Sequence, residues 1–440
     1  MEHKEKDHES GLSRRLGLLA STLAGIGVIL GAGIYVLVGV AANKAGNAVW
    51  LSFLIAAVVA TFTGLSYARL GRLRPKNAPE FQYLNLAFGR TPAFLAGWLI
   101  LWATVISSAA VALGFGSYLE HILGVPYLAG AIGLIILSSV VVFVGVGESV
   151  LFAGILTIVE ISGVVLIIAI GIPSFGQVNL LEMPMGVSGV IGAASLVFFA
   201  YLGFEGMANL SEEMKNPERD LPKAMLLALG ISTVLYMLVT VSAVSVLGWQ
   251  DLSQSSAPLA AVASRLLGTK ADLLLTLIAL GSTANTVLLL LFASSRAMWA
   301  MSCAGALPMT FCVIGEKRRT PWFTIIIVGA FASIFALIKN IEDVAEFTNF
   351  VTLLAFAGVN ASAIRIFARN KSDGQPKHVL ADIVLPTFGL LTSLWLAVST
   401  GWHAALFGAI LLAAGLFLHF LLRRLGARVT SSSDEAQSRQ

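Results

Sequence analysis

The sequence predicts an all-α polytopic membrane protein with twelve transmembrane helices: a five-plus-five inverted repeat with broken helices 1 and 6, plus two C-terminal helices. Of its 440 residues, 57% are hydrophobic and only 12% are charged, against about 25% charged for a typical soluble domain. Long apolar segments recur along the whole chain, and about 20 apolar residues suffice to cross a bilayer. Glycine and polar residues interrupt two of these segments, the first and the sixth.

The apolar segments give the boundaries of the predicted spans. They lie near residues 16–41, 48–70, 92–119, 125–146, 150–172, 188–209, 224–247, 273–303, 321–338, 344–367, 379–399 and 402–422. Residues 1–14 and 425–440 form polar tails. The first span is too long for the apolar region of a signal peptide, so we expect it to stay in the mature protein.

The distribution of basic residues predicts the orientation. Most of the 28 Lys and Arg residues fall in the two tails and in the loops after spans two, six, eight and ten, and the opposite side holds only Lys44, Arg265, Lys270 and Lys339. Basic loops stay on the cytoplasmic side. We therefore expect both termini in the cytoplasm and the protein in the cell's inner (cytoplasmic) membrane. The net charge of +4 then reflects topology and indicates no nucleic-acid partner.

The two cysteines, Cys303 and Cys312, lie at the predicted cytoplasmic end of span eight, so we expect reduced thiols and no structural disulfide. No closely spaced Cys/His set predicts a metal site. The chain has no nucleophile elbow, no P-loop and no metal-binding histidine pair at helical spacing, so no enzyme and no cofactor is predicted.

The first span contains glycines at 25, 27, 31 and 33. Each costs about 1 kcal/mol relative to alanine in a helix interior. Irregular backbone at membrane depth persists only where it is buried in protein or lines a cavity. The pattern indicates a binding site at the midplane, as in secondary transporters. Close helix packing is the alternative, most of all for Gly25.

The sixth span carries Gly203, Glu205 and Gly206 deep in an apolar stretch. An ionisable residue at that depth is costly enough to suggest a function. Breaks in spans one and six predict a repeat of five spans, whose second copy is inverted because five is odd. The first repeat would cover residues 15–172 and the second 173–370, with spans eleven and twelve (371–424) outside them.

Each break has a chemical use. An unwound turn before a new half-helix exposes N–H groups beside a positive dipole end and can bind a carboxylate. The half-helix that stops at the other break exposes carbonyl oxygens, which can bind an ammonium group. Together they would recognise the zwitterionic head of an α-amino acid.

Several motifs, in order, resemble the amino acid–polyamine–organocation (APC) permeases. They are Gly27–Tyr35, Leu51–Ala57, Pro75-Lys76 with Glu80, Phe198–Glu205, Glu212–Pro222, and Ser295-Arg296 followed by Gly305–Pro308. The resemblance runs from about residue 12 to 424 and implies the inverted repeat and alternating-access transport of amino acids or related amines.

The resemblance also implies roles for individual residues. Gly31, Ala32 and Gly33 match the family's carboxylate-binding turn. Phe199, Ala200 and Leu202 match positions whose backbone carbonyls hold the amino group, and Phe199 also matches an aromatic gate. Glu205 matches an acidic position past the break, where it is either a proton-coupling group or a carboxylate that caps free N–H groups.

Two positions depart from the family. Arg69 replaces a common acidic residue, for which we expect a rearranged cytoplasmic ion pair. Glu160 stands where proton-coupled members carry a lysine. Because burial without a partner favours the neutral form of a carboxyl group, Glu160 is our main candidate for proton coupling. A hydrogen bond to a neighbouring helix is its structural alternative.

Span eight offers Ser282, Thr283, Asn285 and Thr286 as a pocket, a sodium site, or interhelical hydrogen bonds. Arg296 is expected to neutralise an acidic residue. The predicted function is secondary active amino acid transport, as a proton symporter. The alternatives are an amino acid/polyamine or amine exchanger, a sodium symporter and a channel. The expected partners are the small-molecule substrate, protons and the lipid bilayer, with the chain a monomer or homodimer.

Overall fold

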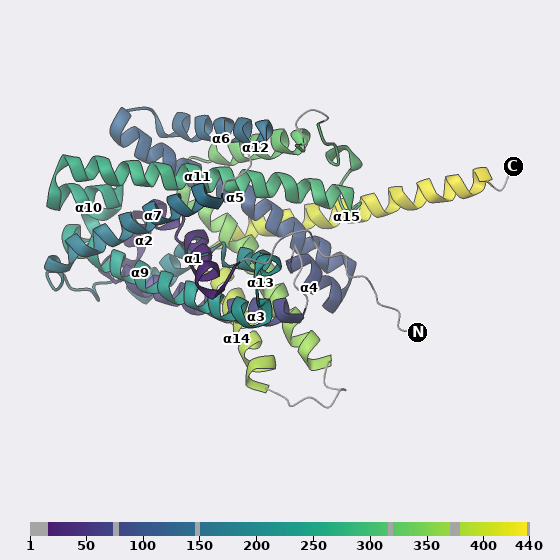
Figure 1. Cartoon of the computed structure of the whole chain (residues 1–440), viewed down its shortest axis with the longest axis horizontal. Helices are drawn as coiled ribbons and strands as arrows, with labels where there is room; N and C mark the ends of the chain where they lie inside the picture. The colour runs from purple at the N-terminus through teal and green to yellow at the C-terminus, as the bar shows by residue number, and fades with distance from the viewer. Residues whose placement is uncertain (1–15, 74–78, 146–149, 316–319, 370–378, 438–440) are drawn as a thin grey trace.

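The computed structural model describes residues 16–73, 79–145, 150–315, 320–369 and 379–437. The tail 1–14, Pro75-Lys76 of the second-span motif and the residues just before span five, Glu148 and Ser149, lie outside the described residues. Helices follow one another throughout the described chain (Figure 1).

The first repeat contains the predicted spans one to five and one additional helix. Its elements are α1 (Leu18–Ile29), α2 (Gly33–Ala45), η1 (Gly46–Ala48), α3 (Val49–Leu73), α4 (Pro79–Phe88), α5 (Arg90–Leu123), α6 (Tyr127–Val144), α7 (Val150–Gly171) and η2 (Ile172–Ser174).

The second repeat and the C-terminal pair follow. They comprise α8 (Gly186–Val197), η3 (Phe198–Tyr201), η4 (Phe204–Glu213), α9 (Pro217–Gln254), α10 (Pro258–Leu267), α11 (Thr269–Cys303), η5 (Met309–Phe311), α12 (Trp322–Ala336), α13 (Ile341–Arg369), the π-helix η7 (Leu380–Val384), α14 (Leu385–Ser399) and α15 (Trp402–Gln437).

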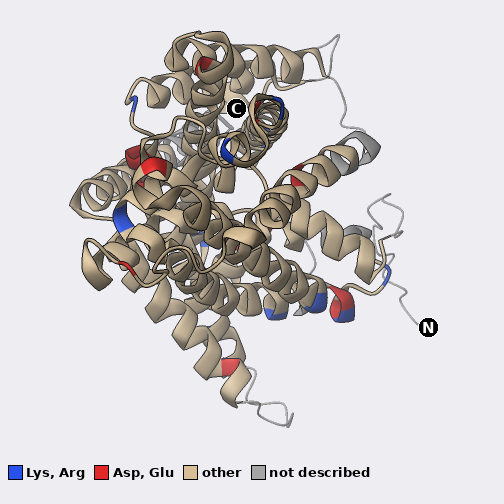
Figure 2. Cartoon of the chain, turned by 90° about the vertical axis from the view of Figure 1, so that its left-hand side faces the viewer, with Lys and Arg blue, Asp and Glu red and all other residues tan. Residues whose placement is uncertain are grey.

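Every predicted span has a helix or a pair of half-helices. Within the described residues, 10 helical stretches are long and apolar enough to cross a membrane. One of them, Gly33–Gly71, joins α2 to α3, which belong to different spans, and α12, with 15 residues, is not among the 10. The chain is a multi-pass membrane protein, and Figure 2 shows charged residues thinly scattered over a largely uncharged bundle.

Both predicted breaks are present. The first span divides between Ile29 and Gly33, and the sixth changes from α-helix to 3₁₀-helix at Phe198 and is interrupted between Tyr201 and Phe204. The long helices α5 and α11 run along the length of the bundle, with α10 near one end and α4 near the other (Figure 1).

The buried apolar side chains of the described residues form two clusters. One gathers mainly α2, α3 and α9, and the other mainly α5 with parts of α6 and α12, whereas α11 and α13 contribute to both. The broken helices contribute to both: Ile34 and Ala200 belong to the first cluster, and Ala32 and Phe199 to the second. The two breaks therefore lie where the two cores meet.

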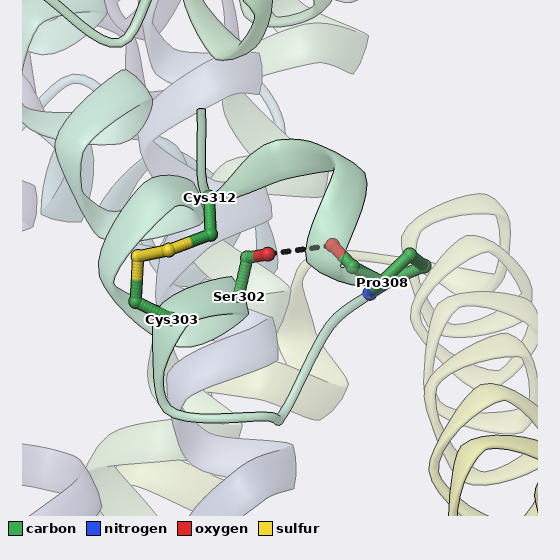
Figure 3. Close-up of a disulfide and its surroundings, with 4 residues drawn as sticks. All are labelled: Ser302, Cys303, Pro308 and Cys312. Carbon is green, nitrogen blue, oxygen red and sulfur yellow. Dashed lines mark hydrogen bonds between the residues drawn. A yellow bond between two sulfur atoms is a disulfide. The ribbon is translucent and has the colours of Figure 1, made fainter. Parts of the chain in front are cut away.

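Two expectations, one for Arg69 and one for the cysteines, have opposite outcomes. Arg69 pairs with Asp382 of η7 and lies over the ring of Phe367, so the predicted ion pair is confirmed. The expectation of reduced thiols is wrong, because Cys303 and Cys312 form a disulfide (Figure 3).

The disulfide has a local cause. The chain turns back directly after α11, with Gly305 at φ +71°. The Ser302 hydroxyl donates to the Pro308 carbonyl at 2.5 Å (Figure 3). This turn brings the Cα atoms of Cys303 and Cys312 to 5.0 Å. Sequence spacing alone does not reveal such a turn.

Candidate functional site

The two breaks touch each other through glycine. A Cβ atom placed on Gly33 would lie 2.6 Å from Cα of Ala200. One placed on Gly203 would lie 3.0 Å from the carbonyl oxygen of Val28, and Gly203 also has φ +111°. Real Cβ atoms do not make contacts as short as the first one. Both positions therefore need glycine, and the backbone of each break forms the surface that the other break faces.

Backbone polar groups are concentrated at this contact. The helix α2 begins at Gly33 without a side-chain cap on its N-cap residue, Ala32. The first N–H groups of a helix have no partner within it and lie at its positive dipole end. The first N–H groups of α2 are therefore without a side-chain cap, and the binding of a carboxylate at Gly31, Ala32 and Gly33 stays a prediction.

The carbonyl groups of the second break already have partners. The Leu202 N–H donates to the Phe199 carbonyl at 3.2 Å. The Tyr236 hydroxyl of α9 lies 2.8 Å from the Ala200 carbonyl oxygen and 2.6 Å from that of Ile29, the last residue of α1. A carbonyl oxygen has two lone pairs, so each can accept a second donor. The side chain of Phe199 is 6% exposed and packs in the second core cluster.

Glu160 is buried in α7, with 3% of its surface exposed. The hydroxyl of Tyr35, in α2, donates to the Glu160 backbone carbonyl at 2.9 Å. Thr157, one turn earlier, occupies the space that a Cβ on Gly27 would need, at 2.4 Å from its hydroxyl oxygen. The helix that carries Glu160 therefore contacts both halves of the broken first span.

The polar residues of α11 face different ways. Thr286 Oγ1 would lie 3.2 Å from a Cβ on Gly31, so it is next to the break. Ser282, one turn away, is buried, and its hydroxyl approaches the Glu160 carboxyl group of α7. Thr283 donates to Ala279 of its own helix at 2.7 Å, and Asn285 is half-buried. Thr286 thus lies beside the break, although its hydroxyl, like that of Thr283, donates to a carbonyl of its own helix, that of Ser282, at 3.0 Å.

Glu205 lies after the second break, and its side chain accepts a hydrogen bond from the backbone of that break. Its Oε2 atom accepts a hydrogen bond from the Gly203 N–H at 2.9 Å. This is the contact expected of a capping carboxylate, the structural alternative for this residue. Nearby, the Tyr67 hydroxyl donates to Glu80 of α4 at 2.8 Å, and the rings of Tyr67 and Phe204 are in edge contact.

Sequence reasoning missed Tyr236 and Tyr35. A tyrosine in an apolar helix is too common a signal to identify a site. Their role depends on the carbonyl groups they meet on other helices. Asn349 of α13 donates to the carbonyls of Ser195 and Leu196 at 2.7 and 2.9 Å and holds the last turn of α8 before its break.

Comparison with known proteins gives a consistent result. A profile of the amino acid permease family matches residues 16–431. The branched-chain amino acid permease BcaP of Bacillus subtilis is 28% identical over 445 residues, 94% of each chain. The methylthioribose transporter of the same organism is 31% identical over 94% of each chain. The mouse cationic amino acid transporter 4 is 30% identical over 82% of this chain and 61% of its own length.

Proposed function

Because the chain belongs to the amino acid permease family, we propose that it is a secondary active transporter that carries amino acids across the cytoplasmic membrane by alternating access. The observation that carries this proposal is the contact between two broken helices where two cores meet. If one core moves against the other, a ligand held at that contact is exposed first on one side of the membrane and then on the other. Both termini are placed in the cytoplasm in this proposal, and the unit is a monomer or homodimer.

The substrate's head group is assigned to the backbone. The carboxylate would bind the N–H groups at Gly31, Ala32 and Gly33. The ammonium group would bind the carbonyls of Phe199, Ala200 and Leu202. Thr286, beside Gly31, would complete the pocket from α11. Phe199 would close the pocket from one side, because its ring is nearly buried beside the break.

Glu160 is proposed as the proton-coupling group, with Glu205 as the second candidate. Glu160 is a buried carboxyl group on a helix that contacts both halves of the first span, and the Ser282 hydroxyl of α11 approaches its side chain. Protonation at such a position would change how α7 holds the first span. The capping contact of Glu205 with Gly203 makes it the weaker candidate.

An exchanger of amino acids against amines is the second candidate function. Glu160 and Glu205 are carboxyl groups at membrane depth, which a cationic cargo would favour, and one relative is named a cationic amino acid transporter. An amine without a carboxylate would leave the N–H groups at Gly33 unpaired, which argues for amino acids on at least one side of the exchange.

Uptake into vesicles tests the function and its coupling. Purified protein would be reconstituted, and the twenty labelled amino acids would be offered with a proton gradient, a sodium gradient or neither. We expect accumulation driven by protons alone. Glu160→Gln should keep exchange and lose proton-driven accumulation, whereas Glu120→Gln, at an exposed position of α5, should keep both. Accumulation by Glu160→Gln with a proton gradient alone would dismiss Glu160, and a strict sodium requirement would shift the coupling site to the region between α1 and α11.

A further inference from the structure

One hydroxyl group lies between the two breaks. The Tyr236 oxygen is 2.6 Å from the carbonyl oxygen of Ile29, in α1, and 2.8 Å from that of Ala200, in η3. The side chain is fully buried, and its ring packs against Phe53 and Tyr201. The ring is held by this packing, so the hydroxyl cannot leave the two carbonyls without a change in the surrounding helices.

This arrangement has fewer donor hydrogens than acceptor oxygens. A tyrosine hydroxyl has one hydrogen to donate, and here two carbonyl oxygens lie within hydrogen-bond distance. It can satisfy only one of them well at a time. An ammonium group that binds the Ala200 carbonyl would free the hydroxyl to donate wholly to Ile29. When no ammonium group is bound, the hydroxyl is the donor available to Ala200, and a buried carbonyl without a donor is costly.

We propose that Tyr236 is a positioning residue that stands in for the substrate's ammonium group at the Ala200 carbonyl when the transporter is empty. This inference rests on the proposed function. When no substrate is bound, the hydroxyl links the two breaks. The empty transporter can then close its site and reorient it to the other side of the membrane. Bound cargo takes over the Ala200 carbonyl and makes the hydroxyl unnecessary there. Tyr236 is thus required more by the empty protein than by the loaded one.

The test compares exchange with net uptake. Wild type, Tyr236→Phe and Tyr118→Phe would be reconstituted, and the probe would be whichever of the twenty labelled amino acids gives the largest exchange in wild type. Tyr118 is a matched control, because it too is a buried tyrosine whose hydroxyl donates to a backbone carbonyl, that of Tyr35, at 3.0 Å. Exchange moves the loaded protein in both directions, whereas net uptake requires the empty protein to return.

We expect Tyr236→Phe to keep exchange within two-fold of wild type and to lower net uptake at least ten-fold, and Tyr118→Phe to change neither. An equal fall in both rates, or unchanged net uptake, would overturn the inference. Wild-type protein that exchanges none of the amino acids would instead contradict the proposed function itself.

Melting temperatures give a second readout if Tyr236→Phe is unstable or if wild type exchanges without net uptake. The same amino acid should raise the melting temperature of Tyr236→Phe by more than that of wild type, because it supplies the missing donor to Ala200. An equal or smaller rise would overturn the inference.

Discussion

The ammonium group of Lys44 lies 2.8 Å from a carboxylate oxygen of Glu346, and this ion pair joins the end of α2 to the first half of α13. Glu342, one turn earlier on α13, approaches the same ammonium group to 2.5 Å. One cation thus holds two carboxylates at the C-terminal end of α2, the second half of the broken first span. The three side chains are only partly exposed.

Loss of this cation should weaken the contact between α2 and α13. Lys44→Met leaves two carboxylates without their shared partner, so we expect slower uptake, by at most about five-fold, since partly exposed ion pairs contribute about 0.2 to 1 kcal/mol. Raising the salt concentration should slow wild type and spare the variant. Lys270→Met, at an exposed position of α11, is the control. An identical change in the control would assign the effect to overall charge.

Gly33→Leu should abolish amino acid binding while the protein still inserts and elutes as a single species in size-exclusion chromatography. The added side chain starts 2.6 Å from Cα of Ala200, so the two breaks must separate. Gly230→Leu is the matched control, because a Cβ on Gly230 meets nothing within 4 Å. Wild-type affinity in a well-folded Gly33→Leu protein would place the binding site elsewhere.

Phe199→Ala should weaken amino acid binding by about 1 to 3 kcal/mol, the range for one large buried apolar side chain. Because the ring is 6% exposed beside the break, its removal should also raise the leak of substrate from loaded vesicles. Phe417→Ala changes a ring that is 70% exposed on α15 and should affect neither quantity. Unchanged affinity and leak in Phe199→Ala would remove its role as a gate.

Glu80 should make stability depend on pH. Burial in α4 raises the pKa of its carboxyl group above the ordinary value near 4.5, although hydrogen bonds from Tyr67 and from the backbone oppose this. Folding therefore favours the neutral form, so the stability contribution is complete below the ordinary pKa and is lost as pH rises through the raised one. Glu80→Gln keeps an acceptor for Tyr67 and removes the charge.

Thermal melting between pH 4 and 8 would check this, because the range begins below the carboxyl group's ordinary pKa near 4.5. The melting temperature of Glu80→Gln relative to wild type should increase as pH rises, while exposed Glu120→Gln should show no such trend. A pH-independent difference between Glu80→Gln and wild type would contradict the role assigned to burial.

The sequence was sufficient to predict the spans and both breaks, because apolar length and glycine in a membrane helix are local properties of the chain. It did not reveal α4 and α10. Each has 10 residues and a proline in its first turn, and both are too short to resemble a span. The disulfide was mispredicted because it depends on the turn at Gly305, which joins residues from opposite ends of a loop.

For the candidate site, the sequence predicted the backbone groups at the two breaks but not the side chains that contact them. The breaks predicted exposed N–H and carbonyl groups, whereas the assignment to Gly31, Ala32, Gly33 and Ala200 came from the family resemblance and stays a prediction. Tyr236 was not predicted, because its hydroxyl contacts Ile29 and Ala200 from a helix that carries no break. On α11 the sequence offered Ser282, Thr283, Asn285 and Thr286 without separating them, and the structure places Thr286 next to Gly31.

The most direct test of the central claim is a binding series that varies only the head group of the ligand. The amino acid that most stabilises the purified protein against heat would be compared with its decarboxylated amine and its N-acetylated form, at equal concentrations. Recognition of the carboxylate at Gly33 and of the ammonium group at Ala200 predicts that only the intact amino acid raises the melting temperature. An equal rise with the amine or with the N-acetylated form would contradict the account.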